Sequence, residues 1–326
     1  MPMISEKEIV AAQTRIAPHV LRTPLVSAGA LSRALGVDVA LKPETLQETG
    51  SFKLRGATNA MLSLSPEARA RGVVTASSGN HGPALACAAT RLGVASTICL
   101  SEMVPENKVA NVRANGGTAR IEGCDYDQSL QVCMRLVADQ GLTLVHPFDD
   151  AAVAAGSGTV GLELAEDAED LESVLVPLSG GGLLAGVATA IKARMPQVRV
   201  IGVSMERGAS MIASLAAGQP VEVAEVETLA DALGGNIGLD NRWTFETVRT
   251  LVDDCVTVSE AAISEAMRLL FRHQGMVVEG AGAVGVAALA TGAVRSSGRV
   301  ACVLSGRNVA PDAFIDIVSE RSRADG

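Results

Sequence analysis

Short apolar runs alternate with longer stretches of helical pattern along nearly the whole chain. The apolar runs are rich in valine and are bounded by glycine, serine or proline, which is typical of buried strands. Ala-rich segments such as residues 83–93 and 263–273 lie between them and are typical of helices. This alternation predicts an α/β fold with open, twisted parallel sheets covered on both faces. The predicted strands are residues 37–42, 72–77, 95–100, 142–147, 173–178, 198–204 and 300–305.

The length of 326 residues favours two such sheets rather than one. No repeat, charge block or low-complexity linker marks a boundary between them. One uncharged run, residues 173–191, is long enough for a membrane helix, but it contains Pro177 and three consecutive glycines. We interpret it as a buried strand, a tight turn and a helix, and we expect no membrane contact.

Composition and charge exclude several classes of function. Hydrophobic residues make up 48% of the chain, which provides a core and excludes a disordered protein. The net charge of −9 and the aromatic content of only 2% argue against a nucleic-acid partner. The six cysteines form no C-x-x-C pair, and the first residues lack a signal-peptide pattern. We therefore expect reduced thiols and a cytoplasmic location.

Two segments match the G-x-G-x-x-G pattern of dinucleotide-binding proteins. Residues 156–161 follow a segment without strand character, so this match lacks the context that the motif requires. Residues 280–285 follow the apolar run MVVE and fit better. The alternative for 280–285 is that the small residues allow a helix to pack closely on the sheet.

A third glycine-rich segment, SGGGLLAG at 179–186, joins a predicted strand to a predicted helix. Backbone N–H groups at such a helix start bind phosphate, and the helix dipole favours the anion. A tight turn without a ligand is one alternative. Another is a nicotinamide dinucleotide, because Glu206 follows the next strand at the distance of a ribose-binding carboxylate.

Polar residues gather at the end of the strand 72–77, in the sequence SSGNHG. Ser77, Ser78, Asn80 and His81 precede a helix that begins near Pro83. Hydroxyl, amide and backbone N–H donors at such a turn suit a carboxylate ligand. The alternative is that Asn80 and His81 only form the turn and cap the helix.

Lysine is rare in this chain, with five residues, and Lys53 is the one with a chemical interpretation. Gly50 and Ser51 predict a helix start, which places Lys53 in the first helical turn. The helix dipole opposes a cation there and lowers its pKa, which favours the neutral amine. A neutral lysine amine forms Schiff bases with carbonyl compounds. The alternative is an ordinary surface lysine.

Four ordered motifs, TGSFKLRGA (49–57), SSGNHGPALA (77–86), SGGGLLAG (179–186) and LSGRN (304–308), resemble the fold-type II pyridoxal-phosphate enzymes. The similarity is greatest to the serine/threonine dehydratase and serine racemase family, and it extends from residue 22 to residue 308. Residues 205–211 and 233–242 also resemble the hydroxyectoine-utilisation dehydratases.

The resemblance implies a fold similar to the β-chain of tryptophan synthase. It implies a large domain of residues 1–55 and 149–326 that binds pyridoxal 5′-phosphate, and a small domain of residues 56–148. The cofactor would lie between them. We further expect a homodimer or a homotetramer.

The resemblance also implies roles for individual residues. Lys53 would carry the cofactor, with Phe52 beside it, and Asn80 would bind the phenolic oxygen of the ring. Ser305 would face the pyridine nitrogen, and Ser78 would lie opposite Lys53 across the cofactor plane. The phosphate would be held by Ser179, Gly180, Gly181, Gly182 and Leu183, and the substrate carboxylate by Ser77, Ser78, Gly79, Asn80 and His81.

The implied reaction is the loss of water from a β-hydroxy amino acid, giving a 2-oxo acid and ammonia. Threonine, serine, 3-hydroxyaspartate and a hydroxyectoine-derived compound are the candidate substrates. An amino-acid racemase is the first alternative, and a nicotinamide-dependent oxidoreductase is less favoured. A binding protein without catalysis would leave Lys53 unused.

Three positions depart from related patterns. Ser78 is found in racemase-like and hydroxyaspartate-dehydratase-like members, whereas typical threonine dehydratases resemble S-A-G-N-H there. Ser204 and Ser210 align with the acidic ligands of a divalent-cation site in racemase-like members, so we expect no metal. Arg307 replaces a glycine, and it is either a surface cation or a contact to an acidic group of the substrate.

Overall fold

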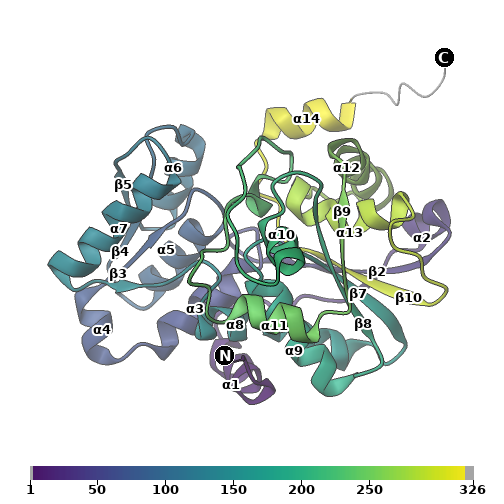
Figure 1. Ribbon diagram of the computed structural model, residues 1–326, viewed down its shortest axis with the longest axis horizontal. Coiled ribbons are helices and arrows are strands. Elements are labelled where there is room, and N and C mark those ends of the chain that lie inside the picture. The colour runs from purple at the N-terminus through teal and green to yellow at the C-terminus, as the bar shows by residue number, and fades with distance from the viewer. Residues whose placement is uncertain (1–2, 320–326) are drawn as a thin grey trace.

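The computed structural model describes residues 3–319, whose strands form two separate sheets (Figure 1). The larger sheet has the strand order β1-β2-β10-β7-β8-β9. Its neighbouring strands are parallel, except that β1 is antiparallel to β2. The strands are β1 (Val26–Ser27), β2 (Asp38–Pro43), β7 (Leu171–Pro177), β8 (Arg199–Met205), β9 (Asp254–Val258) and β10 (Arg299–Leu304).

The larger sheet is covered on both faces, as its apolar strands require. On β10, Ala301 and Val303 join one core, whereas Val300, Cys302 and Leu304 join the other. Because successive side chains point to opposite faces, a strand buried on both sides is apolar throughout. One face is covered by α1 (Glu6–Ile16), α8 (Ala151–Asp167), α9 (Gly182–Arg194), α10 (Ser210–Ala217) and α11 (Thr244–Leu251), and the other by α2 (Gly29–Leu35), α12 (Glu260–Gln274), α13 (Gly280–Ala290) and α14 (Pro311–Ser319).

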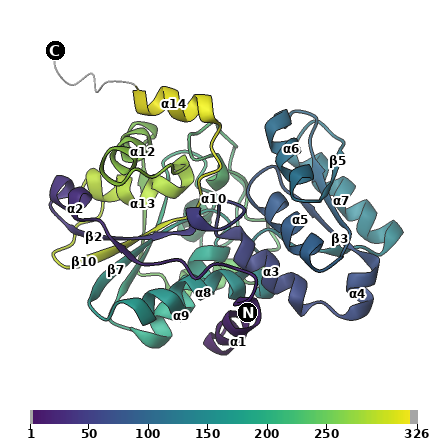
Figure 2. The same ribbon diagram turned by 180° about the vertical axis from the view of Figure 1, so that it is seen from behind.

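The smaller sheet is wholly parallel and has the order β5-β4-β3-β6. It lies beside the larger sheet in both views (Figures 1 and 2). On β3 and β4, alternate side chains again enter two different cores. The strands are β3 (Val73–Ala76), β4 (Ser96–Leu100), β5 (Thr118–Ile121) and β6 (Thr143–Leu144), and the helices around them are α3 (Lys53–Ser63), α4 (Pro66–Arg71), α5 (His81–Arg91), α6 (Glu106–Ala114) and α7 (Tyr126–Gln140).

The predicted α/β fold is confirmed, and each of the seven predicted strands is present, although only residues 143–144 of the run 142–147 are paired. The uncharged run 173–191 forms β7, a glycine turn and α9, as predicted. No helix among residues 3–319 has the length and hydropathy of a membrane span. The division at residues 55/56 and 148/149 stays a prediction. The first of these predicted boundaries falls inside helix α3, which packs on both α5 and α8.

The two G-x-G-x-x-G segments are part of helices. Residues 156–161 lie within α8, and residues 280–285 open α13. A Cβ atom at Gly156 would lie 2.6 Å from the carbonyl oxygen of Arg55, and one at Gly186 would lie 2.4 Å from that of Ala154. In α8 and α9, glycine therefore allows the close approach of α3, α8 and α9.

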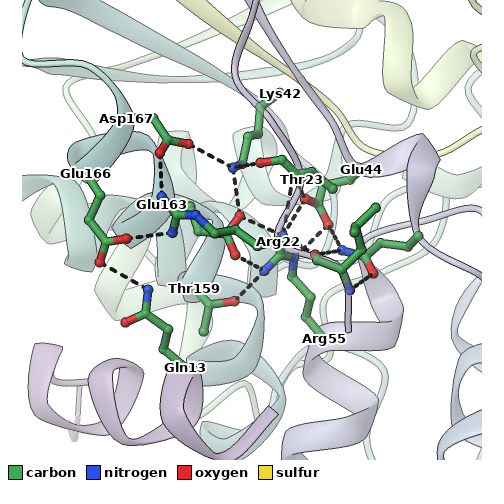
Figure 3. Close-up of polar contacts among 12 residues, drawn as sticks. Gln13, Arg22, Thr23, Lys42, Glu44, Arg55, Thr159, Glu163, Glu166 and Asp167 are labelled. Carbon is green, nitrogen blue, oxygen red and sulfur yellow. Dashed lines mark hydrogen bonds and ion pairs between the residues drawn. The ribbon is translucent and has the colours of Figure 1, made fainter. Parts of the chain in front are cut away.

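A buried ion cluster joins α3 to two other elements (Figure 3). Arg55 on α3 is fully buried, and its Nε donates to Oε2 of Glu44 at 2.7 Å. Its Nη1 donates to Oε1 of Glu163 on α8 at 2.6 Å and to Oγ1 of Thr159 at 3.1 Å. Glu44 belongs to the 3₁₀ turn η1 (Glu44–Leu46) that follows β2. The guanidinium thus joins three segments that are distant in the sequence.

Lys42 at the end of β2 completes the charge balance. Its Nζ lies 2.7 Å from Oε2 of Glu163 and donates to the carbonyl oxygen of Thr23 at 2.6 Å. Burial alone would raise the pKa of Glu44, but the charge and hydrogen bonds of Arg55 outweigh burial and lower it. Two buried cations and two buried carboxylates therefore neutralise one another.

Replacement of Arg55 by methionine should destabilise the protein strongly. The substitution would leave Glu44 and Glu163 buried without their main partner, at a cost of about 3–5 kcal/mol. The midpoint of urea unfolding is the measurement. The control is Arg22→Met, since Arg22 is half-exposed and pairs with Glu166 and Asp167 at the surface. Surface pairs contribute about 1 kcal/mol or less, so equal losses for the two variants would contradict this prediction.

Candidate active site

The candidate site is a cavity of about 380 Å³ between the two sheets. Strands β7 and β10 are neighbours in the larger sheet, and the residues after their carboxyl ends line the cavity. The residues that follow the carboxyl end of β3 line it from the smaller sheet. Ligands of open α/β sheets bind beyond the carboxyl ends of the strands, so the topology itself predicts a site at this position.

Lys53 is the first residue of α3, which confirms the predicted helix start. Gly50 has a φ of +75°, which a residue with a side chain rarely adopts, and the turn that follows brings Lys53 to the cavity. The Nζ atom donates to the carbonyl oxygen of Pro147 at 2.7 Å and lies 5.2 Å from the centre of the Phe52 ring. No carboxylate whose side chain the structure describes lies within ion-pair distance of it.

The pKa of Lys53 is lowered to about 8, and the cause is burial. The predicted lowering is therefore present, but its main source is desolvation by the surrounding protein rather than the helix dipole. Removal of an ammonium from water without a compensating carboxylate disfavours the charged form. At pH 7 roughly a tenth of this amine is unprotonated, far more than for an ordinary lysine, and the neutral form can act as a nucleophile or a base.

The turn between β7 and α9 forms one wall of the cavity. Gly181 has a φ of +86°, and α9 begins at Gly182. A Cβ atom at Gly180 would lie 2.3 Å from the ring of Phe148, so a side chain there would displace this aromatic ring. The first N–H groups of α9 have no partner within the helix and, with the helix dipole, suit an anion. These features fit a phosphate group.

The loop from Ser77 to Asn80 forms the facing wall. Ser77 is buried, whereas Ser78 and Gly79 are exposed toward the cavity. The ring of His81 is buried, and its Nε2 lies 3.2 Å from the carbonyl oxygen of Val145, to which it can only donate. Burial, with a smaller contribution from Lys53, lowers the pKa of His81 to about 3. The His81 side chain is therefore neutral and is not a cation for a carboxylate ligand.

Asn80 is held by two side chains beside the larger sheet, one directly before α13 and one in the loop after β10. Its Nδ2 donates to Oε1 of Glu279 at 2.7 Å, and its Oδ1 accepts from Nδ2 of Asn308 at 2.7 Å. Ser305 follows β10 and is buried next to this group, and its carbonyl oxygen accepts from the backbone N–H of Phe52 at 3.0 Å. The motifs at 49–57, 77–86 and 304–308 thus meet at one point.

The structure brings thirteen of the fourteen predicted site residues into the lining of one cavity. The exception is Arg307, which is exposed and donates through Nη1 to the carbonyl oxygen of Thr45 at 2.5 Å. Its predicted substrate contact has no support in this arrangement and stays a prediction. Glu206, the candidate ribose ligand, is exposed and does not line the cavity.

Sequence reasoning missed several charged residues of the cavity. Glu279 is 4% exposed and lies directly before the 280–285 glycine motif. Lys108 on α6 lies 2.8 Å from Asp231 of the 3₁₀ turn η2 (Asp231–Leu233), and both line the cavity. For Glu279 a signal was present, because it is the acidic residue that ends the apolar run MVVE. The pair Lys108–Asp231 joins distant segments and has no local signal.

Comparison with known proteins gives consistent results. A family model described as "Pyridoxal-phosphate dependent enzyme" matches residues 16–306. The chain is 43% identical over 307 residues to the L-threonine ammonia-lyase of Thermotoga maritima, which covers 94% of this chain and 76% of that protein. The maize serine racemase structure superposes with a TM-score of 0.91 at 35% identity and 96% coverage of each chain. The processed form of threonine deaminase isoform 2 from Solanum lycopersicum has a TM-score of 0.87 at 34% identity, covering 97% of this chain and 94% of that one.

The cavity fits pyridoxal phosphate on its own geometry. The glycine turn before α9 offers N–H groups for the phosphate, and the amine of Lys53 faces the same space. The amide of Asn80 and the neutral hydroxyl of Ser305 line the same cavity. The site thus combines an anion-binding turn with an unpaired amine of lowered pKa, which an aldehyde-bearing phosphate ester requires.

Pyridoxal phosphate added to the cofactor-free protein and then reduced with borohydride should label Lys53. The labelling rate should rise with pH and level off above about 8, because only the neutral amine attacks the aldehyde. Peptide mapping is the measurement. Lys42 is the internal control, since it is buried and paired with Glu163. A label on another lysine, or a rate that levels off near the ordinary lysine pKa of about 10.4, would overturn the assignment.

Proposed function

Because the chain belongs to the family of pyridoxal-phosphate-dependent enzymes, we propose that it is a dehydratase whose substrate is L-threonine. The reaction converts L-threonine to 2-oxobutanoate and ammonia. Water leaves in the first stage and is consumed again when the nitrogen is released, so atoms balance. The observation that carries the proposal is the unpaired amine of Lys53 beside the anion-binding turn at Ser179–Leu183.

Each wall of the cavity has a part in binding. The turn at residues 179–183 holds the cofactor phosphate, and Asn80 donates to an oxygen of the ring. The loop from Ser77 to Asn80 binds the substrate carboxylate through hydroxyl and backbone N–H groups. When bound, pyridoxal phosphate supplies an electron sink that stabilises negative charge at the substrate Cα.

Lys53 moves the proton. Its Nζ, with a pKa of about 8, accepts the proton from the substrate Cα once the amine is free. Electrons from this C–H bond form the new double bond as the C–O bond at the β-carbon breaks. The hydroxyl leaves as water with the proton that Nζ of Lys53 removed from Cα, so protons balance. Ser305 would offer the bound cofactor a neutral hydroxyl rather than a carboxylate, which would favour elimination over racemisation.

The choice of substrate rests on the charge of the residues that line the cavity. The charged residues that line it are mostly acidic, with Glu279, Asp231, Glu225 and Glu227 against Lys53 and Lys108. A neutral β-hydroxy side chain, as in threonine or serine, avoids repulsion by these carboxylates. This favours threonine and serine over 3-hydroxyaspartate. The cytoplasmic location and the homodimer or homotetramer stay predictions.

The racemase is the second candidate, because Ser78 is exposed to the cavity. Racemisation requires an acid–base group on each face of the cofactor plane, whereas elimination requires one. Ser78 is the residue that the motifs offer for the second face. The two activities therefore differ in their dependence on this hydroxyl.

Ser78→Ala should lower racemisation of L-serine by at least roughly 100-fold and leave measurable 2-oxo acid formation. The assay measures D-serine and pyruvate in the same reaction, and 2-oxobutanoate from L-threonine in a parallel one. Ser63→Ala is the control, because Ser63 ends α3 outside the cavity and donates to the carbonyl oxygen of Asn59. For the wild type, D-serine formed faster than pyruvate, with no 2-oxobutanoate, would reverse the choice of function.

Activity should persist in EDTA. The positions that align with carboxylate ligands in racemase-like members hold hydroxyls, and Ser210 donates its hydroxyl to the carbonyl oxygen of Gly235 at 2.8 Å. Ser204 is buried beside Met205, and a serine is a weak ligand for magnesium or calcium. Dehydration of L-threonine before and after chelation is the measurement. A large loss that magnesium restores would reveal a cation site that this interpretation lacks.

A further inference from the structure

A buried carboxylate faces the cavity without a place in the reaction described above. Glu279 directly precedes α13 and is 4% exposed. Its Oε1 accepts from Nδ2 of Asn80 at 2.7 Å, and its Oε2 accepts from the backbone N–H of Asn308 at 3.1 Å. Its own N–H donates to the carbonyl oxygen of Gly306. The carboxylate is therefore tied to the loop after β10 and to the loop after β3.

These contacts fix the direction of the Asn80 amide. An ionised carboxylate has no proton to donate, so only the NH₂ end of Asn80 can face Glu279. The opposite end, Oδ1, accepts from Nδ2 of Asn308, which also donates to the carbonyl oxygen of Thr49 at 2.9 Å. Asn308 is thus oriented by its own acceptor. One hydrogen of Asn80 Nδ2 is used by Glu279, and the other remains for a ligand.

We propose that Glu279 is a positioning residue that acts through Asn80. It holds the amide so that the second Nδ2 hydrogen is available to an oxygen of the cofactor ring. The inference rests on the proposed function for the cofactor contact of Asn80, although not on the identity of the substrate. Glu279 itself takes no proton from the substrate and contacts the cofactor only through the amide.

The backbone at Gly306 and Gly50 packs closely against the side chains of Glu279 and Asn308. A Cβ atom at Gly306 would lie 2.2 Å from Oε1 of Glu279, and one at Gly50 would lie 2.4 Å from Oδ1 of Asn308. Gly50 also has its positive φ. Glycine at both positions is therefore required by the close approach of the two polar side chains to the backbone.

The charge of Glu279 varies near neutral pH. Burial and the negative charge of Asp231 raise its pKa to about 7, and the opposing effects of Asn80, the Asn308 N–H and Lys108 do not compensate. Above pH 7 the ionised form prevails and holds the amide. Below pH 7 the protonated carboxyl is a weaker acceptor for Nδ2 of Asn80, so the amide keeps only its contact to Asn308 and its Nδ2 hydrogens are held less firmly.

The test measures cofactor affinity in a double-mutant cycle. Glu279→Gln keeps the shape but can present either end of an amide to Asn80, so it should weaken binding of pyridoxal phosphate by roughly 10-fold. Asn80→Ala should also weaken it. In the Asn80→Ala background, Glu279→Gln should have less than about a 2-fold further effect, because the residue through which it acts is gone. Equal effects in both backgrounds would overturn the proposal.

Two further measurements separate this role from a purely structural one. Cofactor affinity of the wild type should fall more steeply as pH drops through about 7 than that of Asn80→Ala, in which only protonation of Lys53 still weakens binding. This readout needs no Glu279 variant, and an equally steep fall in both proteins would contradict the proposal. The matched control is Glu172→Gln, since Glu172 also accepts from a backbone N–H, that of Gly298, but lies at the opposite end of β7. An equal loss of affinity in Glu172→Gln would likewise count against a specific role.

The experiment also distinguishes the inference from the proposed function. Threonine dehydration by the wild type tests the function, and the cofactor cycle tests Glu279. If the wild type forms no 2-oxobutanoate but the effects of Glu279→Gln and Asn80→Ala on cofactor affinity are not additive, threonine is the wrong substrate and the positioning role stands. If the wild type dehydrates threonine but the two effects are additive, the proposed function stands and the positioning role is wrong.

Discussion

The position of the Lys53 amine depends on the buried ion pairs of Arg55. Arg55 is two residues from Lys53 on α3, and it binds Glu44 after β2 and Glu163 on α8 at the same time (Figure 3). A buried arginine between two carboxylates has a strict geometry, because its planar fork matches each carboxylate in only a few orientations. Helix α3 therefore begins at a fixed place relative to the larger sheet, and Lys53 is directed into the cavity.

The electrostatics of the cavity contrast with those of this cluster. Arg55 and Lys42 have buried carboxylate partners, whereas Lys53 is left with a backbone carbonyl. In the first case the buried carboxylates offset the cost of removing a charge from water, whereas Lys53 has no such partner and burial opposes its charged form. Two lysines only eleven positions apart in the sequence thus have different roles. Lys42 is paired with a buried carboxylate, and Lys53 offers an amine to the cavity.

Most of the fold was predictable, because strands buried on both faces are continuous apolar runs. The three strands that were missed lack this pattern: β1 has two residues, β5 is largely exposed, and β9 is the half-buried edge strand. The motif residues of the site were also predictable. Glu279, Lys108 and Asp231 were not, since their roles arise from contacts between distant segments. The low pKa of Lys53 was expected from the helix dipole, but burial, which the sequence does not specify, is its main cause.

The ion pair of Lys108 and Asp231 has a different character from the Arg55 cluster. It joins α6, beside the smaller sheet, to η2, which belongs to the loops of the larger one, and both side chains are about one-third or more exposed. Solvent screens such a pair, so it contributes about 1 kcal/mol or less and breaks at little cost. Both partners also act on Glu279, with Asp231 raising its pKa and Lys108 lowering it. Asn80, on the loop after β3, lies on the same side as Lys108, whereas Asp231 and Glu279 lie on the side of the larger sheet. Separation of the two walls would therefore remove Lys108 from Glu279, raise the proton affinity of that carboxylate and break its hydrogen bond to Asn80. Closure of the cavity and orientation of the amide thus depend on each other.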